Sequence, residues 1–144
     1  MIFVSKENLS HNYRQIDKFS GNSKIISVIK GDGYGHGLLE CCKILKTNKC
    51  KDFYVARLDD AIKLRENFKS INIYLLSGVI SNNDLKEIKK HKIIPIINNV
   101  DQLSLLKTSQ KLKYVLHIDT GMNRLGFQAS ELEKYSNLID KKNI

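Results

Sequence analysis

A chain of 144 residues is long enough for one domain and too short for two large ones. Hydrophobic residues make up 42% of the chain and charged residues 27%, a composition that excludes disordered and collagen-like proteins. No stretch approaches the ~18 uninterrupted apolar residues of a membrane-spanning helix, and the first residues lack the pattern of a signal peptide. We therefore expect no membrane partner and a cytoplasmic location.

The net charge of +9 comes from lysines that are spread along the chain. Lysine supplies 20 of the 24 basic residues, and its longest runs are the pairs Lys89-Lys90 and Lys141-Lys142. Lysine, isoleucine and asparagine are all abundant, as an AT-rich coding sequence would produce. Scattered charge is typical of a solvated surface, so we expect no nucleic-acid partner. A basic binding module without small-molecule chemistry is the alternative.

The predicted elements begin with a helix over residues 5–18, for which Ser5 is a candidate cap. Gly21-Asn22 ends it, and the apolar run 25–29 predicts a short buried strand that stops at Lys30. A glycine-rich loop over 31–37 and an amphipathic helix over 38–49 follow.

The same alternation of strand and helix then repeats to the end of the chain. The predicted strands are 53–56, 71–76, 93–97 and 114–118, and the predicted helices are 58–68, 82–91, 100–110 and 130–138. A turn at Ser77-Gly78 and a loop over 119–126 follow two of these strands.

This order predicts an α/β fold of about five βα units. The strands are continuous apolar runs, which is typical of strands that are covered on both faces of a parallel sheet. Two architectures remain open, a doubly wound sheet or the N-terminal portion of a (β/α)8 barrel, since a complete TIM-type barrel takes about 250 residues. In both, chemistry is expected just beyond the C-terminal ends of the strands.

The three cysteines, Cys41, Cys42 and Cys50, form no metal or redox motif. They are odd in number and have neither Cys-x-x-Cys spacing nor a histidine at ligand spacing. We predict buried, structural thiols and no metal site.

The loop after the first strand is a candidate site. Lys30 ends the strand, and four glycines follow within residues 31–37, which suits the close approach of a ligand. A partly desolvated lysine is a usable nucleophile toward a carbonyl, whereas a lysine at a sheet rim is otherwise a solvated side chain. The glycine spacing fits neither a dinucleotide-binding nor a Walker motif.

The loop after the last strand is the second candidate. Arg124 lies between Gly121 and Gly126, in a chain with only four arginines. Its planar guanidinium suits a carboxylate or a phosphate. The alternative is an Asp119–Arg124 ion pair that holds the loop together.

These two segments resemble known motifs. Residues 28–37, VIKGDGYGHG, resemble the cofactor-lysine motif of the alanine racemases, commonly V-K-A-N-A-Y-G-H-G. Residues 117–127, HIDTGMNRLGF, resemble their D-T-G-M-x-R-L-G motif, and weaker likenesses lie at 9–13 and 55–61. The resemblance covers nearly all of the chain, with both motifs in the expected order.

The resemblance implies the N-terminal part of a pyridoxal-phosphate-binding (β/α)8 barrel over residues 1–144. The full protein would interconvert L- and D-alanine for peptidoglycan, and a homodimer is implied. Lys30 would bind the cofactor covalently and act as one of two acid–base groups. Tyr34 would hydrogen-bond the cofactor phosphate, and Arg124 would lie near the cofactor and the substrate carboxylate. The remaining barrel strands and a β-rich C-terminal domain, which brings the opposing base from the partner subunit, would lie outside this chain.

The sequence departs from the family pattern in three places. Gly31-Asp32-Gly33 replaces the commoner Ala-Asn-Ala, and His117 stands where many members carry a lysine. Family members are also more than twice as long, so this chain has the features of a fragment that would be inactive alone. The alternatives within the resemblance are a non-catalytic pyridoxal-phosphate homeostasis protein and another racemase or decarboxylase on the same barrel.

Overall fold

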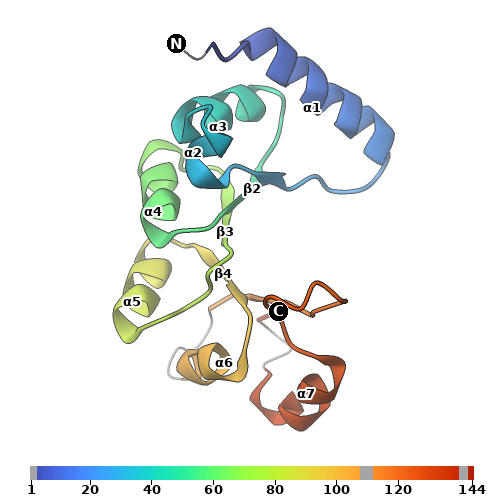
Figure 1. Ribbon diagram of the computed structural model, residues 1–144. Coiled ribbons are helices and arrows are strands. Elements are labelled where there is room, and N and C mark those ends of the chain that lie inside the picture. The colour runs from blue at the N-terminus through green and yellow to red at the C-terminus, as the bar shows by residue number, and fades with distance from the viewer. Residues whose placement is uncertain (1–2, 108–111, 140–142) are drawn as a thin grey trace. The chain divides into compact units, whose positions relative to one another are not determined.

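The computed structural model describes residues 3–107, 112–139 and 143–144 (Figure 1). It divides into two compact units, residues 1–73 and 74–144. We call them the first and second unit and describe each by itself.

The first unit alternates helices with parallel strands. Ser27 of β1 lies opposite Phe53 of β2, and Val28 lies opposite Tyr54. The next strand starts in the same direction, because the amide of Asn72 donates to the carbonyl of Lys51 at 2.7 Å. The elements of this unit are α1 (Lys6–Ser20), β1 (Ser27–Val28), α2 (Lys30–Tyr34), α3 (Leu38–Thr47), β2 (Asp52–Val55), α4 (Leu58–Asn67) and the beginning of β3 (Asn72–Leu75).

Helix α1 begins as its sequence predicts. The hydroxyl of Ser5 accepts a hydrogen bond from the amide of Asn8 at 3.1 Å, which satisfies one of the free donors of the first turn. The helix buries Ser10 and Tyr13 and joins the end of α3, where the Asn48 amide donates to the Ser10 hydroxyl at 2.9 Å.

The core of the first unit includes β2 and the helix that follows it. Phe53, Val55 and Leu64 are fully buried, as expected for a parallel strand with helices over its face. Cys42 is fully buried as well, and burial raises the pKa of its thiol to about 12. The prediction of buried, structural thiols is confirmed, because all three cysteines are free and buried.

The second unit repeats the pattern with three parallel strands. Tyr74 pairs with Ile94 and Ile96 with Val115, so the strands lie in chain order. Isoleucines 88, 93 and 97 and Leu103 form its fully buried core. The elements are the end of β3, α5 (Asn82–Lys90), β4 (Ile94–Ile97), α6 (Val100–Leu106), β5 (Val115–Leu116), α7 (Ala129–Lys134) and a 3-10 turn η1 (Ser136–Leu138).

Polar caps set where the helices of the second unit start. The hydroxyl of Ser81 accepts from the amide of Asp84 at 3.1 Å, and the side chain of Asn99 accepts from the amide of Gln102 at 3.0 Å. Gln128 and Glu131 form a reciprocal capping box at the start of α7. These side chains satisfy free amides in the first turn of each helix.

The predicted order of strands and helices is confirmed, with local differences, among them that the predicted strand 25–29 is reduced to Ser27–Val28. The expected loop 31–37 contains the short helical turn α2, whose glycines permit a left-handed backbone. The predicted strand 114–118 is shorter, and the predicted helix 130–138 is split into α7 and η1. Residues 108–110 of the predicted helix 100–110 lie outside the described residues.

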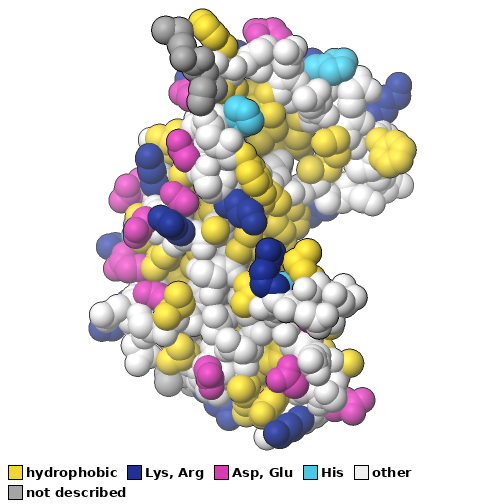
Figure 2. All heavy atoms as spheres, viewed as in Figure 1, with side chains coloured by type: hydrophobic (Ala, Val, Ile, Leu, Met, Phe, Trp, Pro, Cys, Tyr) yellow, Lys and Arg dark blue, Asp and Glu magenta, His cyan; other side chains and the backbone are white. Residues whose placement is uncertain are grey.

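Basic and acidic side chains alternate over the face that Figure 2 shows. This arrangement follows from the scattered lysines of the sequence. Across the described ranges, no helix is long and apolar enough to cross a membrane.

Candidate functional site

Lys30 lies at the C-terminal end of β1, where the backbone is held by the neighbouring strand. Ile29, the residue before it, is 3% exposed, and its amide donates to the carbonyl of Tyr54 at 3.0 Å. Lys30 itself is half-buried. The residue before Lys30 is therefore buried and hydrogen-bonded, while Lys30 itself remains partly accessible.

The turn that follows Lys30 is left-handed. Gly31, Asp32 and Gly33 have φ/ψ values of 59/47°, 53/46° and 64/35°, and Tyr34 has φ of 54°. A left-handed backbone costs about 1–2 kcal/mol for each residue with a Cβ, and glycine does not pay this cost. Two of the four positions are glycine, and the carbonyl of Ile29 accepts from the amide of Gly33 at 3.0 Å.

The side chain of Asp32 ties this turn to the helix that follows. Its carboxylate accepts a hydrogen bond from the amide of Leu38, the first residue of α3, at 2.8 Å. A carboxylate at a helix N-terminus is favoured both by the free amides and by the helix dipole. Asp32 therefore acts as a structural cap for α3.

A cavity of about 560 Å³ opens beside the Lys30 turn. Lys30 and Tyr34 both line it, so the structure brings these two predicted residues together. Arg57 also lines this cavity and was not among the predicted site residues. It directly follows the predicted strand 53–56, and residues at such positions are candidates for a site in this kind of fold. The complete lining is Lys30, Gly31, Asp32, Tyr34, Ala56, Arg57 and Asp60.

The residues around this cavity fit a phosphorylated aldehyde cofactor. The volume lies in the range of small-molecule sites, ~300–1,000 Å³. A lysine amine can bind an aldehyde carbon covalently, while a tyrosine hydroxyl and a guanidinium are donors for phosphate oxygens. The Tyr34 side chain is 62% exposed and is thus open to a ligand.

Arg124 lies in the second unit, in the loop that follows β5. Its side chain is exposed, and within the described ranges no ion pair joins it to an acidic residue. The cavity beside Lys30 is lined wholly by residues of the first unit.

Among the described residues, the alternative of an Asp119–Arg124 ion pair is not found, and Asp119 instead binds the loop backbone. Its carboxylate accepts from the amide of Gly121 at 3.0 Å and from the amide of Asn123 at 3.0 and 3.1 Å. These backbone hydrogen bonds hold the pKa of the Asp119 carboxyl below its usual range. Amides inside the loop satisfy the carboxylate, which leaves the Arg124 guanidinium available for a ligand.

The ends of this loop are closed by backbone hydrogen bonds. The amide of Phe127 donates to the carbonyl of His117 at 2.7 Å, and the amide of Asp119 donates to the carbonyl of Phe127 at 2.9 Å. Gly126 has φ of 105°, and a Cβ there would lie 2.8 Å from the amide nitrogen of Asp119. Only glycine fits this close approach of two chain segments.

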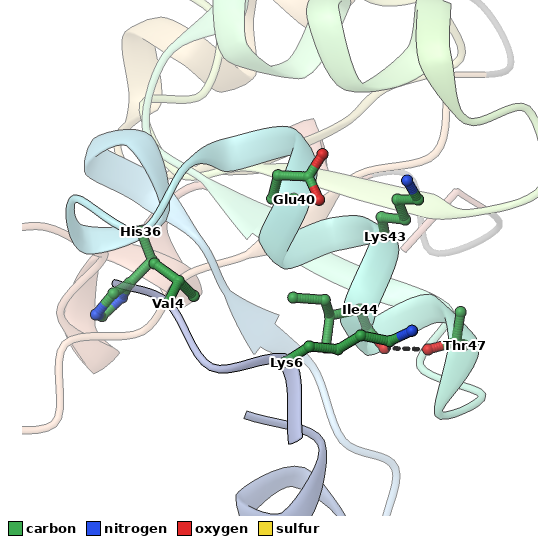
Figure 3. Close-up of a pocket in the computed structure, with 7 residues that line it drawn as sticks. All are labelled: Val4, Lys6, His36, Glu40, Lys43, Ile44 and Thr47. Atoms are coloured by element: carbon green, nitrogen blue, oxygen red, sulfur yellow. Dashed lines mark hydrogen bonds between the residues drawn. The ribbon is translucent and has the colours of Figure 1, made fainter. Parts of the chain in front are cut away.

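A second cavity, of about 380 Å³, lies between the start of α1 and helix α3 (Figure 3). None of the predicted site residues lines it. His36 does, but its Nδ1 is bonded to the carbonyl oxygen of Gly33 at 3.0 Å. The Thr47 hydroxyl donates to the carbonyl of Ile44 at 2.6 Å, so it is also satisfied within the protein. We therefore place the candidate site in the cavity beside Lys30.

Comparisons with known proteins identify the family of this chain. The family described as "Alanine racemase, N-terminal domain" matches residues 4–144. The chain is 41% identical over 129 residues to an alanine racemase of Clostridium kluyveri, covering 86% of this chain and 33% of that protein. It is 37% identical over 146 residues to one of Pasteurella multocida, covering 98% and 40%.

Solved structures show the same fold. An alanine racemase of Oenococcus oeni matches with a TM-score of 0.81 at 33% identity, over 96% of this chain and 36% of that one. An alanine racemase of Clostridium difficile in complex with cycloserine matches with a TM-score of 0.79 at 30% identity, over 92% and 38%. The chain thus spans about two fifths of the length of the relatives it matches. The fold is therefore the N-terminal portion of the TIM-type barrel and not a doubly wound sheet, and the chain belongs to the alanine racemase N-terminal domain family.

Proposed function

We propose that this chain is the N-terminal part of a pyridoxal-phosphate-dependent racemase that interconverts L- and D-alanine. The observation that carries the proposal is that the half-buried residue Lys30 lines a cavity with Tyr34 at the end of a parallel strand, in a chain of this family. The product would supply D-alanine for peptidoglycan. The relatives named above are alanine racemases, which supports this substrate.

The roles of the three site residues are those that the family resemblance implies, and the chemistry of their side chains supports them. Lys30 binds the cofactor through its amine and moves a proton at the α-carbon of the substrate on one face. The hydroxyl of Tyr34 holds the cofactor phosphate, and the guanidinium of Arg124 binds the substrate carboxylate. When bound, the cofactor supplies an electron sink that stabilises negative charge at the α-carbon.

Racemisation also needs a proton to be delivered on the opposite face. We place this second acid–base group outside the chain, on the partner subunit of a homodimer, so the complete site needs both the C-terminal domain and a second copy. A cytoplasmic location fits the three buried free cysteines, because thiols persist in a reducing compartment.

The proposal is tested in the full-length protein that carries this chain. We expect it to interconvert the alanine enantiomers and to show the absorbance of a lysine-bound cofactor. Borohydride reduction followed by peptide mapping should place the cofactor on Lys30. Lys30→Ala should remove both the absorbance and the activity, since no other described residue of the cavity offers an amine.

Three outcomes would contradict this proposal in different ways. Cofactor trapped on another lysine would make the Lys30 assignment wrong. Bound cofactor without turnover of alanine would favour the non-catalytic homeostasis protein, and turnover of another amino acid would favour a different racemase or decarboxylase. Lys24, which pairs with the buried Asp52 at 2.8 Å, provides a matched control, because Lys24→Ala should leave the cofactor absorbance in place.

The isolated chain of residues 1–144 should have no racemase activity. It also exposes apolar side chains on and just after its strands, with Val28 of β1 41% and Ile118 47% exposed. Uncovered apolar faces and strand edges favour association between chains. We expect gel filtration of the isolated chain to show aggregates, and a monodisperse monomer with cooperative thermal unfolding would contradict this expectation.

A further inference from the structure

Hydrogen bonds join residues at the ends of three successive strands of the second unit. Asn98 directly follows β4 and is 4% exposed. Its side-chain Nδ2 donates to the carbonyl oxygens of Leu76, after β3, and Ile96, on β4, each at 3.0 Å. Its backbone amide donates to Oε1 of Gln102 at 2.9 Å, and Nε2 of Gln102 donates to the carbonyl of Ser77 at 2.8 Å.

This network determines the orientation of the side-chain amide of Asn98. The Asn98 nitrogen faces two carbonyl oxygens, which only a donor can do without repulsion. The other side-chain atom, Oδ1, is therefore the carbonyl and can only accept. If the amide were reversed, Oδ1 of Asn98 would face the carbonyl oxygens of Leu76 and Ile96 in a buried place. The two hydrogen bonds to these carbonyls would then be lost.

The orientation of Asn98 in turn determines the tautomer of His117. Nδ1 of His117 lies 2.8 Å from Oδ1 of Asn98. Since that oxygen can only accept, Nδ1 carries the proton. A neutral imidazole has one protonated nitrogen, so the lone pair of His117 is on Nε2.

His117 lies at a place where an acceptor matters. It directly follows β5 and begins the segment that contains Asp119 and Arg124, at the strand ends where a βα barrel holds its ligands. The carbonyl of His117 closes this loop through the amide of Phe127, so the ring is attached to a fixed backbone.

We propose that Asn98 is a positioning residue that holds His117 in the Nδ1–H tautomer, which leaves Nε2 as an acceptor at these strand ends. The statement about the tautomer stands on the hydrogen bonds alone, whereas the role in the site rests on the proposed function.

The tautomer is tested by long-range 1H–15N NMR on the full-length protein with 15N-labelled histidine, at a pH where the ring is neutral. His117→Asn assigns the signals by their loss. We expect a protonated-type shift at Nδ1 and an unprotonated-type shift at Nε2 of His117. Asn98→Ala should move His117 toward the other tautomer and leave His91, which bonds to Glu87 through Nε2 at 3.2 Å, unchanged. An Nε2–H signal for His117 in the unmodified protein would overturn the proposal.

The role of Nε2 is tested by a matched pair of substitutions. His117→Asn keeps a nitrogen donor near the Nδ1 position, but it has no atom at Nε2. His117→Gln has a longer side chain whose carbonyl reaches the region of Nε2. We expect kcat/KM to fall about tenfold in His117→Asn, as the loss of one hydrogen bond at Nε2 predicts, and to recover partly in His117→Gln. Thermal stability should be similar in both variants.

Equal activity of His117→Asn and the unmodified protein would overturn the role in the site. A protein that binds the cofactor and never racemises alanine would contradict the proposed function instead, and the NMR experiment would still decide the tautomer. The two failures are therefore distinguishable.

Discussion

The two loops that carry the predicted site residues are held by different means. The turn after Lys30 is built from the backbone, through left-handed residues that pack against α3 and through Asp32, which caps that helix. The loop around Arg124 is held mainly by one carboxylate, that of Asp119, which accepts hydrogen bonds from amides inside the loop. The first arrangement is partly buried, and the second is largely exposed.

This difference indicates how each loop should respond to change. A backbone that is packed against a helix tolerates changes of charge but not of volume. A loop that is held by an exposed carboxylate tolerates changes of volume but depends on its charge. The lysine proposed to bind the cofactor thus lies before the turn that packs against α3, and the arginine proposed to bind the substrate lies in the exposed loop.

The largest effect is expected from Gly33→Ala. A Cβ at Gly33 would lie 2.9 Å from Sγ of Cys41, and the residue has φ of +64°. Conformational strain and overpacking together predict a loss of about 3 kcal/mol in the free energy of unfolding, with weaker cofactor binding. Denaturation of the full-length protein and titration with pyridoxal phosphate would measure the two effects.

Gly31→Ala is the matched control for this prediction. Gly31 has φ of +59°, but a Cβ there meets nothing within 4 Å, so only the conformational cost of about 1 kcal/mol remains. The double variant Gly33→Ala with Cys41→Ala should be more stable than the sum of the single changes predicts. Equal losses for Gly31→Ala and Gly33→Ala would show that packing against α3 does not constrain the turn.

A smaller effect, on function and not on stability, is expected from Asp119→Asn. The amide has nearly the shape of the carboxylate but lacks its charge and one acceptor oxygen. We expect the Arg124 loop to loosen and kcat/KM to fall on the order of tenfold, while the melting temperature changes little. A large loss of melting temperature with unchanged kcat/KM would show that the Arg124 loop supports the stability of the fold and not the activity, contrary to the comparison above.

The pH dependence of this loop follows from the same carboxylate. Its folded-state pKa is lowered, so the stabilisation of the loop is complete above the ordinary pKa of aspartate. It is lost as the pH falls through the lowered value. The loop should therefore be intact at neutral pH, and amide hydrogen exchange at Gly121 and Asn123 should show reduced protection only in strong acid or in Asp119→Asn.

The smallest expected effect is slow chemical labelling of the buried cysteines Cys41 and Cys42. Burial raises the pKa of the thiols of Cys41 and Cys42, the latter to about 12, so the reactive thiolate is scarce at pH 8. Iodoacetamide should label these two cysteines slowly in the folded protein and rapidly after unfolding. Fast labelling of Cys41 in the folded state would show that the support behind the Lys30 turn is open.

The order of the elements could be predicted from the sequence because each depends on local chemistry. Ser5 and the periodic apolar residues that follow are enough to begin α1, and the continuous apolar run 93–97 is enough for a parallel strand. The boundaries of β5 and α7 were less accurate, because the residues at their ends are only half-buried or exposed and tertiary contacts decide them.

The candidate site could be predicted only in part. Lys30 and Arg124 were identified by their place among glycines after strands, and Tyr34 by resemblance. Arg57 was missed because its meeting with Lys30 depends on the pairing of β1 with β2, which brings together residues that are far apart in the chain. The same reason explains why the Asp119–Arg124 ion pair was a mistaken alternative. The spacing of the two residues in the sequence does not show which backbone amides will face the carboxylate of Asp119.

By itself, the sequence determined the class of the fold, the places where strands end, and the chemical groups that follow them. These depend on the period of apolar residues, on caps and on glycines, which act over a few neighbouring residues. The tertiary structure alone decided the left-handed turn after Lys30, the partners of Asp119, and the tautomer of His117. Each of these needs atoms from separate segments to meet at hydrogen-bonding or van der Waals distance, and only the folded chain brings them there.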